Sequence, residues 1–267
     1  MPSAVISRDR RGGPYIPNQS NPDAPTESGA TSNYKQIPNQ PSSNGILRAL
    51  SSSFLSEFES KLRPVDLEFG QVIYEPNQPV DYAYFPTAGV ISLLAAFEDG
   101  STVEAGVIGS EGVLGTWLVM GAETTPHQAL VQSPGHALRI GVRDLRALVH
   151  HDGELMTTLL QYVNAFFNQV AQTAACNRVH KLEQRLARWL LLTHDRVAGD
   201  QFQLTQDFIS RMLAVRRAGV SVAASSLRQM RAIDYQRGNV IVLDREGLER
   251  ASCECYQIVK TQYDRLS

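Results

Sequence analysis

The chain has 267 residues and a formal net charge of −2, and this length favours about two domains. Hydrophobic residues make up 43% of the sequence, enough to build cores, but no uninterrupted apolar run approaches a membrane span. The arginines near the N-terminus have no apolar segment behind them, so a secretory signal is not expected. The cysteines, Cys176, Cys253 and Cys255, are too few and too badly placed for a disulfide framework, which favours a reducing cytoplasm.

The charge is unevenly distributed along the chain. Residues 46–153 contain 6 Lys or Arg against 13 Asp or Glu, whereas residues 178–250 contain 13 against 8. An acidic half followed by a basic half is expected of a chain that binds a polyanion at one end. Ordinary surface variation is the alternative explanation, and the charge count alone does not decide between them.

The first 45 residues are rich in Pro, Asn, Ser and Gln, a composition typical of a disordered tail. Residues 46–60 then place apolar side chains at helical spacing. After them the period changes, and short strand-like runs alternate with turns about every eight residues. The runs are 72–74, 82–85, 90–97, 102–108, 127–132 and 136–140. This pattern indicates an antiparallel barrel or sandwich.

A brief helix is expected at 144–149 and a much longer one at 154–175, whose apolar residues cover more than one face. Their spacing approximates a coiled-coil seam. We expect one side of the long helix to pack on the strands and the other to contact the same helix of a second subunit. The expected interface residues are Leu155, Leu159, Tyr162, Val163, Phe166 and Val170. A helix buried entirely within its own domain is the alternative.

The next helix is expected to follow an interruption at 177–179, with Asn177 as its N-cap. Its inward stripe is expected to contain Val179, Leu182, Leu186, Trp189, Leu190 and Thr193. Thr205 is then a suitable N-cap for a short amphipathic helix, with Asp207 in its first turn.

A second short helix opens near Arg216, and its inward residues are expected to be Val220, Ala223, Ala224, Leu227 and Met230. A turn at 235–239 and the β-rich run 240–243 follow. Two short helices followed by a hairpin with a basic turn is the order of elements in a winged helix-turn-helix.

From about residue 46 to residue 250 the chain resembles the Crp/Fnr family of bacterial transcription regulators. Three segments carry the resemblance: GSEGVLG at 109–115, RLARWLL at 185–191, and LTQDFIS at 204–210 followed by VRRAGV at 215–220. The resemblance implies an α+β fold with an antiparallel, cyclic-nucleotide-binding-like β-roll as sensor domain at 46–153. A dimerisation helix at 154–177 and a winged helix-turn-helix domain at 178–267 would follow, after the tail at 1–45.

The implied function is that of a homodimeric, sequence-specific DNA-binding transcription regulator, with RNA polymerase as the expected protein partner and no membrane association. In cyclic-nucleotide-binding members of the family, a Gly-Glu pair opens a phosphate-binding cassette and an Arg-Ser pair completes it. Here Gly109, Glu111 and Gly112 correspond to the opening, but His127 and Gln128 stand where Arg-Ser would fall. An imidazole or an amide is a poor replacement for a bidentate guanidinium, so we expect a degenerate pocket that does not bind cyclic AMP tightly.

No cofactor or metal is expected. Fe–S sensing in relatives uses grouped N-terminal cysteines, which this tail lacks, and no haem signature is present. We interpret Cys253-x-Cys255 as incidental and His150-His151 as a solvated turn. Nothing resembles a nucleophile–base pair or a pair of catalytic acids, so an enzyme is not expected.

For DNA reading, Arg217 corresponds to a base-contacting Arg of the family's recognition helix, and Arg216 stands at the Ser before it. The family's Glu and second Arg correspond to Ala218 and Val222, so the DNA site should differ from that of better-known members. Further DNA contacts are expected from Ser221 and Ser225 on the same helix, and to phosphates from Thr205, Gln206, Arg237 and Asn239.

Two alternatives stay open. Arg216-Arg217 would be a solvated basic turn if the second helix did not enter the groove. The chain would instead be a small-ligand or cyclic-nucleotide-binding signalling module acting on a protein partner if it had an intact phosphate cassette.

Overall fold

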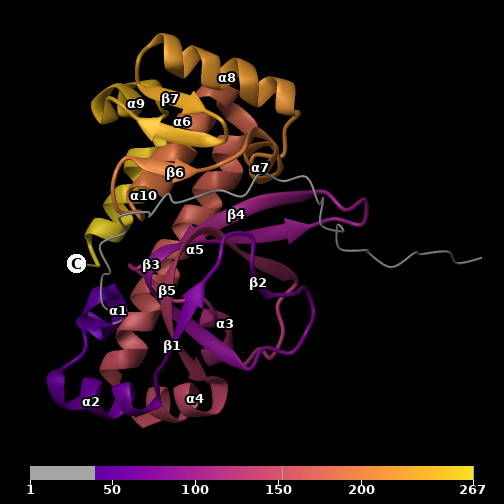
Figure 1. The fold of residues 1–267 in the computed structure, drawn as a ribbon. Coiled ribbons are helices and arrows are strands. Elements are labelled where there is room, and N and C mark those ends of the chain that lie inside the picture. The colour runs from indigo at the N-terminus through magenta and orange to yellow at the C-terminus, as the bar shows by residue number, and fades with distance from the viewer. Residues whose placement is uncertain (1–39, 152, 267) are drawn as a thin grey trace, which may run out of the picture. The chain divides into compact units, whose positions relative to one another are not determined.

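The computed structural model describes residues 40–151 and 153–266, so most of the expected tail lies outside the described residues. The α+β fold expected from the sequence is confirmed: an antiparallel β-roll, a long helix and a C-terminal winged helix-turn-helix follow one another (Figure 1). Two large hydrophobic cores hold these parts together. One fills the roll, and the other fills the winged unit and also includes Val90, Leu94, Val107 and Leu130 of the roll strands. Among the described residues, no helix is long and apolar enough to cross a bilayer.

The described chain begins with the short elements η1 (Pro41–Ser43), α1 (Gly45–Arg48) and α2 (Ser52–Lys61). Asn44 is buried; its Oδ1 accepts hydrogen bonds from the first turn of α1, and its Nδ2 donates to the carbonyl oxygens of Pro86 and Gly112. The tail boundary predicted at residue 45 is therefore too late, because Asn44 already anchors the chain on the roll.

The roll consists of β1 (Arg63–Leu67), β2 (Val72–Tyr74), β3 (Tyr82–Ala96), β4 (Thr102–Ile108) and β5 (His127–Gly141). The strands pair antiparallel in the order β1-β5-β3-β4, and β2 also pairs with β5. β1, which the sequence pattern does not reveal, is an edge strand that contains Pro64, as expected for a residue without a backbone donor.

The strand pairs predicted at 82–85 and 90–97, and at 127–132 and 136–140, are each one long strand. Register shifts between Pro86 and Ile91 let β3 bend while staying paired with β5. A Cβ at Gly135 would lie 2.2 Å from the Ala88 carbonyl oxygen, so this bulge requires glycine. The glycine and proline residues at these positions therefore mark bulges within one strand rather than turns between two strands.

Helix α3 (Thr116–Val119) lies between β4 and β5, and the helices that follow β5 are α4 (Val142–His151), α5 (Gly153–Val179) and α6 (Leu182–His194). The predicted interruption at 177–179 is wrong, because α5 continues through Val179 and Lys181 is the N-cap of α6. Asn177 instead accepts a hydrogen bond from Arg185 Nε at 3.1 Å, and Val179 is exposed rather than inward-facing.

The winged unit contains β6 (Gln201–Gln203), α7 (Gln206–Met212), α8 (Arg217–Gln229), β7 (Ile233–Gln236) and β8 (Asn239–Val242). Its three-stranded sheet has the order β6-β8-β7. Two further helices, α9 (Arg245–Ala251) and α10 (Cys255–Asp264), end the described chain. α10 packs against α5 and α6, so the last residues return to the long helix (Figure 1).

Candidate nucleic-acid interface

Helix α8 buries one apolar face and leaves the opposite face open to solvent. Val220, Ala223, Ala224 and Leu227 are buried, as predicted, but Met230 is 47% exposed because it is already the C-cap residue. The exposed ridge contains Ala218, Val222, Ser225 and Gln229, with Val222 72% exposed. Gln229 was not among the residues expected from the sequence.

The turn before α8 is held by contacts with α7. The Thr205 side chain accepts a hydrogen bond from the Phe208 N–H at 3.1 Å, which confirms Thr205 as the N-cap of α7. Ala214 has φ 50° in the tight connection between α7 and α8. Arg217 Nε lies 3.6 Å from Asp207 Oδ1, and both side chains are largely exposed. Arg217 is therefore oriented by a weak, solvent-screened pair and keeps its donors accessible.

The wing is a two-residue hairpin between β7 and β8. Arg237 (φ 49°) and Gly238 (φ 82°) both adopt left-handed backbone, as a type I′ turn requires. The Leu204 N–H donates to the Gly238 carbonyl oxygen at 2.7 Å, which places the wing tip beside Thr205 at the start of α7. The expected phosphate-contacting residues of α7 and of the wing therefore lie close together.

The expected ligand-pocket residues do not gather at one site. His127 pairs with Ala95 on β3, whereas Ile108, just before Gly109, pairs with Ile91. Four strand residues separate these points, roughly 13 Å at about 3.3 Å per residue. Gln128 Nε2 donates to Glu75 Oε2 at an exposed position. The prediction that all five residues line a single pocket is therefore wrong.

Glu111 is committed to an ion pair with the winged half of the chain. Glu111 Oε1 accepts hydrogen bonds from Arg196 Nε at 2.8 Å and from the Gly109 N–H at 3.1 Å. The Arg196 side chain is only 5% exposed and lies over the ring of Tyr263 in α10. Burial alone would lower the pKa of Arg196, but the charge of Glu111 raises it above its ordinary value. Gly112 lies directly against Tyr162 of α5, where a Cβ would overlap the ring.

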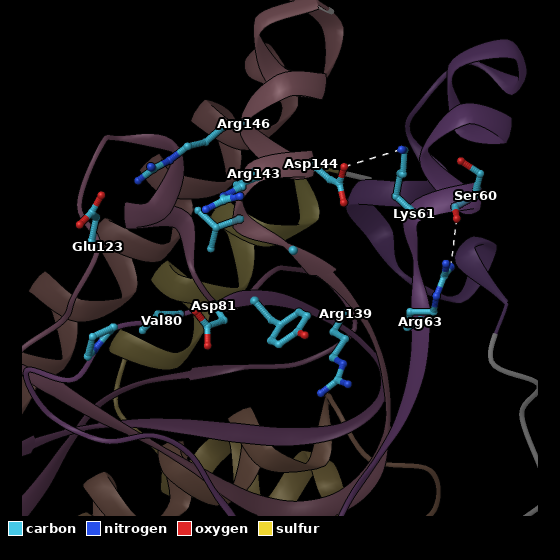
Figure 2. Close-up of a pocket in the computed structure, with 14 residues that line it drawn as sticks. Ser60, Lys61, Arg63, Val80, Asp81, Glu123, Arg139, Arg143, Asp144 and Arg146 are labelled. Atoms are coloured by element: carbon cyan, nitrogen blue, oxygen red, sulfur yellow. Dashed lines mark hydrogen bonds and ion pairs between the residues drawn. The ribbon is translucent and has the colours of Figure 1, made fainter.

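A basic pocket lies elsewhere on the roll, among α2, the start of β3, the end of β5 and α4 (Figure 2). Its cavity volume is about 820 Å³, and five cationic and three acidic side chains line it. Arg146 donates to the carbonyl oxygens of Leu118 and Ala122, and Arg63 donates to those of Ser60 and Leu62. Lys61 pairs with Asp144 at 3.7 Å. Much of the positive charge thus holds neighbouring elements in place, and none of the five predicted pocket residues lines this cavity.

The predicted dimer interface on α5 is wrong, because most of its residues lie on the face of the helix that packs against the roll. Leu155, Leu159 and Tyr162 are buried in the core of their own roll, and Phe166 packs against Gly106 of β4. The opposite face presents Leu160, which is 54% exposed, and Phe167, which is 67% exposed. A second apolar stripe at spacings of four and three follows this face: Met156, Leu160, Val163, Phe167, Val170 and Ala174. Val163 and Val170 are the two predicted interface residues that belong to it.

A buried polar network, which the sequence pattern gave no reason to expect, connects the roll to α6. Trp189 Nε1 donates to Glu104 Oε1 at 2.8 Å, and Gln132 Nε2 donates to Thr193 Oγ1 at 2.7 Å. Ser92 Oγ lies 2.7 Å from Glu104 Oε2 and 2.8 Å from Gln132 Oε1. Because one hydroxyl has one proton for these two acceptors, a protonated Glu104 that donates to Ser92 satisfies the network best.

The pKa of Glu104 is raised from 4.5 to about 7, because desolvation by burial outweighs the hydrogen bonds from Ser92 and Trp189. The folded chain therefore keeps a proton that the unfolded chain releases between these two values. This contribution to stability is complete below about pH 4.5 and is lost as pH rises through 7. The two pKa values correspond to a difference of roughly 3 kcal/mol.

Glu104→Gln, which is neutral at every pH and retains an acceptor for Trp189, should flatten this dependence. We expect the change in unfolding free energy between about pH 5 and pH 8 to shrink by roughly 2–3 kcal/mol. Urea unfolding across that range measures it. Glu98→Gln, at an exposed turn position, is the matched control and should leave the pH profile unchanged. An identical pH profile for Glu104→Gln and the wild type would show that Glu104 is ionised in the folded chain.

Comparison with known proteins gives a family match for each half of the chain. Residues 64–152 match the family described as cyclic nucleotide-binding domain, and residues 184–251 match the Crp-like helix-turn-helix domain. No curated protein gives a match. The chain thus joins a cyclic-nucleotide-binding-like β-roll to a Crp-like winged helix-turn-helix. The chain belongs to the Crp/Fnr family of transcriptional regulators.

Solved structures share this fold at low sequence identity. FixK2 from Bradyrhizobium japonicum has a TM-score of 0.62 and 15% identity, covering 72% of this chain and 98% of that one. A putative Crp/Fnr regulator from Eubacterium rectale has a TM-score of 0.61 and 12% identity, covering 77% and 96%. The c-di-GMP-responsive regulator CLP from Xanthomonas campestris has a TM-score of 0.58 and 14% identity, covering 72% and 99%. At these identities the likeness concerns the fold alone.

Proposed function

We propose that the chain is a homodimeric, sequence-specific DNA-binding transcription regulator that places α8 in the major groove. The observation that carries the proposal is the solvent-facing ridge of α8, flanked by Arg217 and by the wing. An exposed helix with Arg near its N-terminus suits insertion into the groove, where a guanidinium bonds guanine. Thr205, Gln206, Arg237 and Asn239 would contact phosphates on either side.

The chemistry of the ridge supports a distinct operator. Ala218 and Val222 stand on its exposed line, and neither side chain hydrogen-bonds a base. Small apolar groups in the major groove pack against the thymine methyl group. The proposed half-site therefore combines a guanine read by Arg217 with thymines beneath Ala218 and Val222. Ser221 and Ser225 would add hydrogen bonds to bases or phosphates.

Dimerisation through α5 fits the proposal because a two-fold dimer presents two copies of α8 to successive half-sites. The apolar stripe from Met156 to Ala174, in which Leu160 and Phe167 are exposed, supports it because its alternating spacing of four and three residues is that of a two-stranded coiled coil. RNA polymerase is the proposed protein partner. Cyclic AMP is not the proposed effector, because Glu111 is engaged by Arg196 and lies apart from His127 and Gln128.

The test begins by selecting bound sequences from a random DNA pool with the purified full chain. Arg217→Ala should then weaken binding to the selected site by about 30-fold or more, because each lost guanine contact contributes about 1–3 kcal/mol and a dimer loses two. Fluorescence anisotropy at fixed salt measures the affinity, and sedimentation checks that the variant remains dimeric.

Arg250→Ala is the matched control, since it removes the same charge from an exposed ion pair on α9. Its affinity for the selected site should stay close to that of the wild type. Unchanged affinity of Arg217→Ala would mean that the assigned register of the recognition helix is wrong. Failure of the wild-type chain to enrich any sequence would contradict the proposed function itself.

A further inference from the structure

Four potential metal ligands meet where α5 approaches the segment between α9 and α10. Cys176 and His180 are one helical turn apart on α5 and its C-terminal end, so they lie on the same side of the helix. Cys253 and Cys255 come from a segment more than seventy residues later in the chain. The three Sγ atoms and one imidazole nitrogen all lie within 4.8 Å of one another. Cys253-x-Cys255 was interpreted from the sequence as incidental, but the fold brings this pair beside Cys176 and His180.

The distances within this cluster, Cys176–His180–Cys253–Cys255, fit a tetrahedral site. Cys176 Sγ lies 3.5 Å from Cys253 Sγ, and Cys255 Sγ lies 3.5 Å from His180 Nδ1. Zn–S bonds of about 2.3 Å and Zn–N bonds of about 2.0–2.1 Å place neighbouring ligand atoms of a tetrahedron roughly 3.4–3.8 Å apart. The three cysteines are buried and form a small core cluster of their own. Such a closed set is typical of structural rather than catalytic zinc.

The groups around the cluster are those that support metal ligands. His180 Nε2 lies 3.3 Å from Glu254 Oε2, so a carboxylate orients the ring while Nδ1 faces the cysteines. Gln172 Nε2 donates to Cys255 Sγ at 3.0 Å, as an amide does to a ligating thiolate. Arg185 and Arg188 of α6 interact electrostatically with Cys176. Three thiolates and Zn²⁺ have a net charge of −1, which these guanidinium groups offset.

We infer that Cys176, His180, Cys253 and Cys255 bind one Zn²⁺ ion as a Cys₃His site. Binding converts three thiols to thiolates and releases their protons, with no change in oxidation state. The ion would tie the C-terminal end of α5 to the start of α10, beside the two-residue link to α6 that carries the winged unit. The inference does not depend on DNA binding and goes beyond the proposed function.

Metal content of the purified full chain is the direct test. Protein prepared under reducing conditions, without chelator or an affinity tag that binds metal, should contain about one zinc per chain by plasma mass spectrometry. After removal of zinc, added Co²⁺ should give thiolate-to-cobalt charge transfer and the intense ligand-field bands of a tetrahedral site. Zinc should also raise the Tm of the zinc-free protein. Octahedral Co²⁺ spectra, or a metal-free chain that gains no Tm on adding zinc, would overturn the inference.

Matched variants locate the site. Cys253→Ser should lose the charge-transfer bands, and Glu254→Gln should keep them while binding zinc about 10–100-fold more weakly. His151→Gln, at an exposed position, should bind zinc like the wild type. Because Cys253→Ser risks misfolding, circular dichroism accompanies it, and Glu254→Gln tests the inference without removing a ligand. Wild-type affinity in both Cys253→Ser and Glu254→Gln, or a Cys176–Cys253 disulfide in place of metal in the reduced preparation, would contradict it.

Discussion

Glu111→Gln is expected to reduce the free energy of unfolding by about 3–5 kcal/mol, because it leaves the buried Arg196 guanidinium without its counter-charge. Arg196 is only 5% exposed, so water cannot replace the lost carboxylate. Its hydrogen bond to the Leu192 carbonyl oxygen and its contact with the Tyr263 ring involve groups without net charge. Urea unfolding at neutral pH measures the loss.

The double variant Glu111→Leu/Arg196→Met separates an ion-pair effect from a packing effect. Removing both charges should recover most of the stability, because well-packed apolar replacements of buried pairs are often neutral. Glu246→Gln provides the exposed counterpart, since Glu246 pairs with Arg250 at 3.7 Å on the surface of α9. It should cost less than about 1 kcal/mol. A Glu111→Gln variant as stable as Glu246→Gln would show that the buried pair is not a stabilising tie.

This pair also changes the role assigned to the segment after β4. Sequence resemblance places Glu111 in a phosphate cassette, but in the structure its carboxylate contacts the end of α6. The Glu104–Trp189 hydrogen bond joins β4 to the same helix about two turns earlier. The roll therefore contacts α6 and the residues just after it through two acidic side chains, Glu104 and Glu111.

Elements that depend only on residues close together in the sequence were predicted correctly. Thr205 capped α7 as expected, because an N-cap needs only its own side chain and the next three residues. The β4 strand was predicted as one of the short strand-like runs between turns, and the basic glycine turn of the wing from its residue types. The merged strands β3 and β5 were missed because glycine marks a bulge as readily as a turn.

Features that depend on packing between distant segments were not accessible from one sequence. Two stripes on α5 have nearly the same spacing, and only contact with the roll decides which is buried; Leu155 and Tyr162 belong to that buried stripe. Cys176 and Cys253 are likewise separated in sequence by the whole winged unit, so no short sequence motif predicts their contact. The burial of Glu104 could not be predicted either, because it depends on contact with Trp189, which is distant in the sequence.

Phe167→Glu is expected to convert the proposed dimer to a monomer at micromolar concentration. Phe167 lies at the middle of the exposed stripe on α5 and is 67% exposed in the single chain, so its ring is available to a second copy. A two-fold interface would bring two such rings near its axis, and the variant would place two like charges in an apolar seam. The expected loss is at least about 3 kcal/mol, more than 100-fold in Kd. Sedimentation velocity across a concentration series measures it.

Two comparisons distinguish this stripe from the one predicted from the sequence. Gln161→Glu adds the same charge to an exposed position of α5 away from the stripe, and should leave the dimer intact. Leu159→Ala, on the side that packs into the roll, should cost about 2–5 kcal/mol of folding stability without separating the subunits. If the Phe167→Glu chain sedimented as a dimer and Leu159→Ala caused dissociation, the dimer interface would be the stripe predicted from the sequence. The apolar stripe from Met156 to Ala174 would then need another partner, because contiguous apolar side chains that are partly exposed mark an interaction surface.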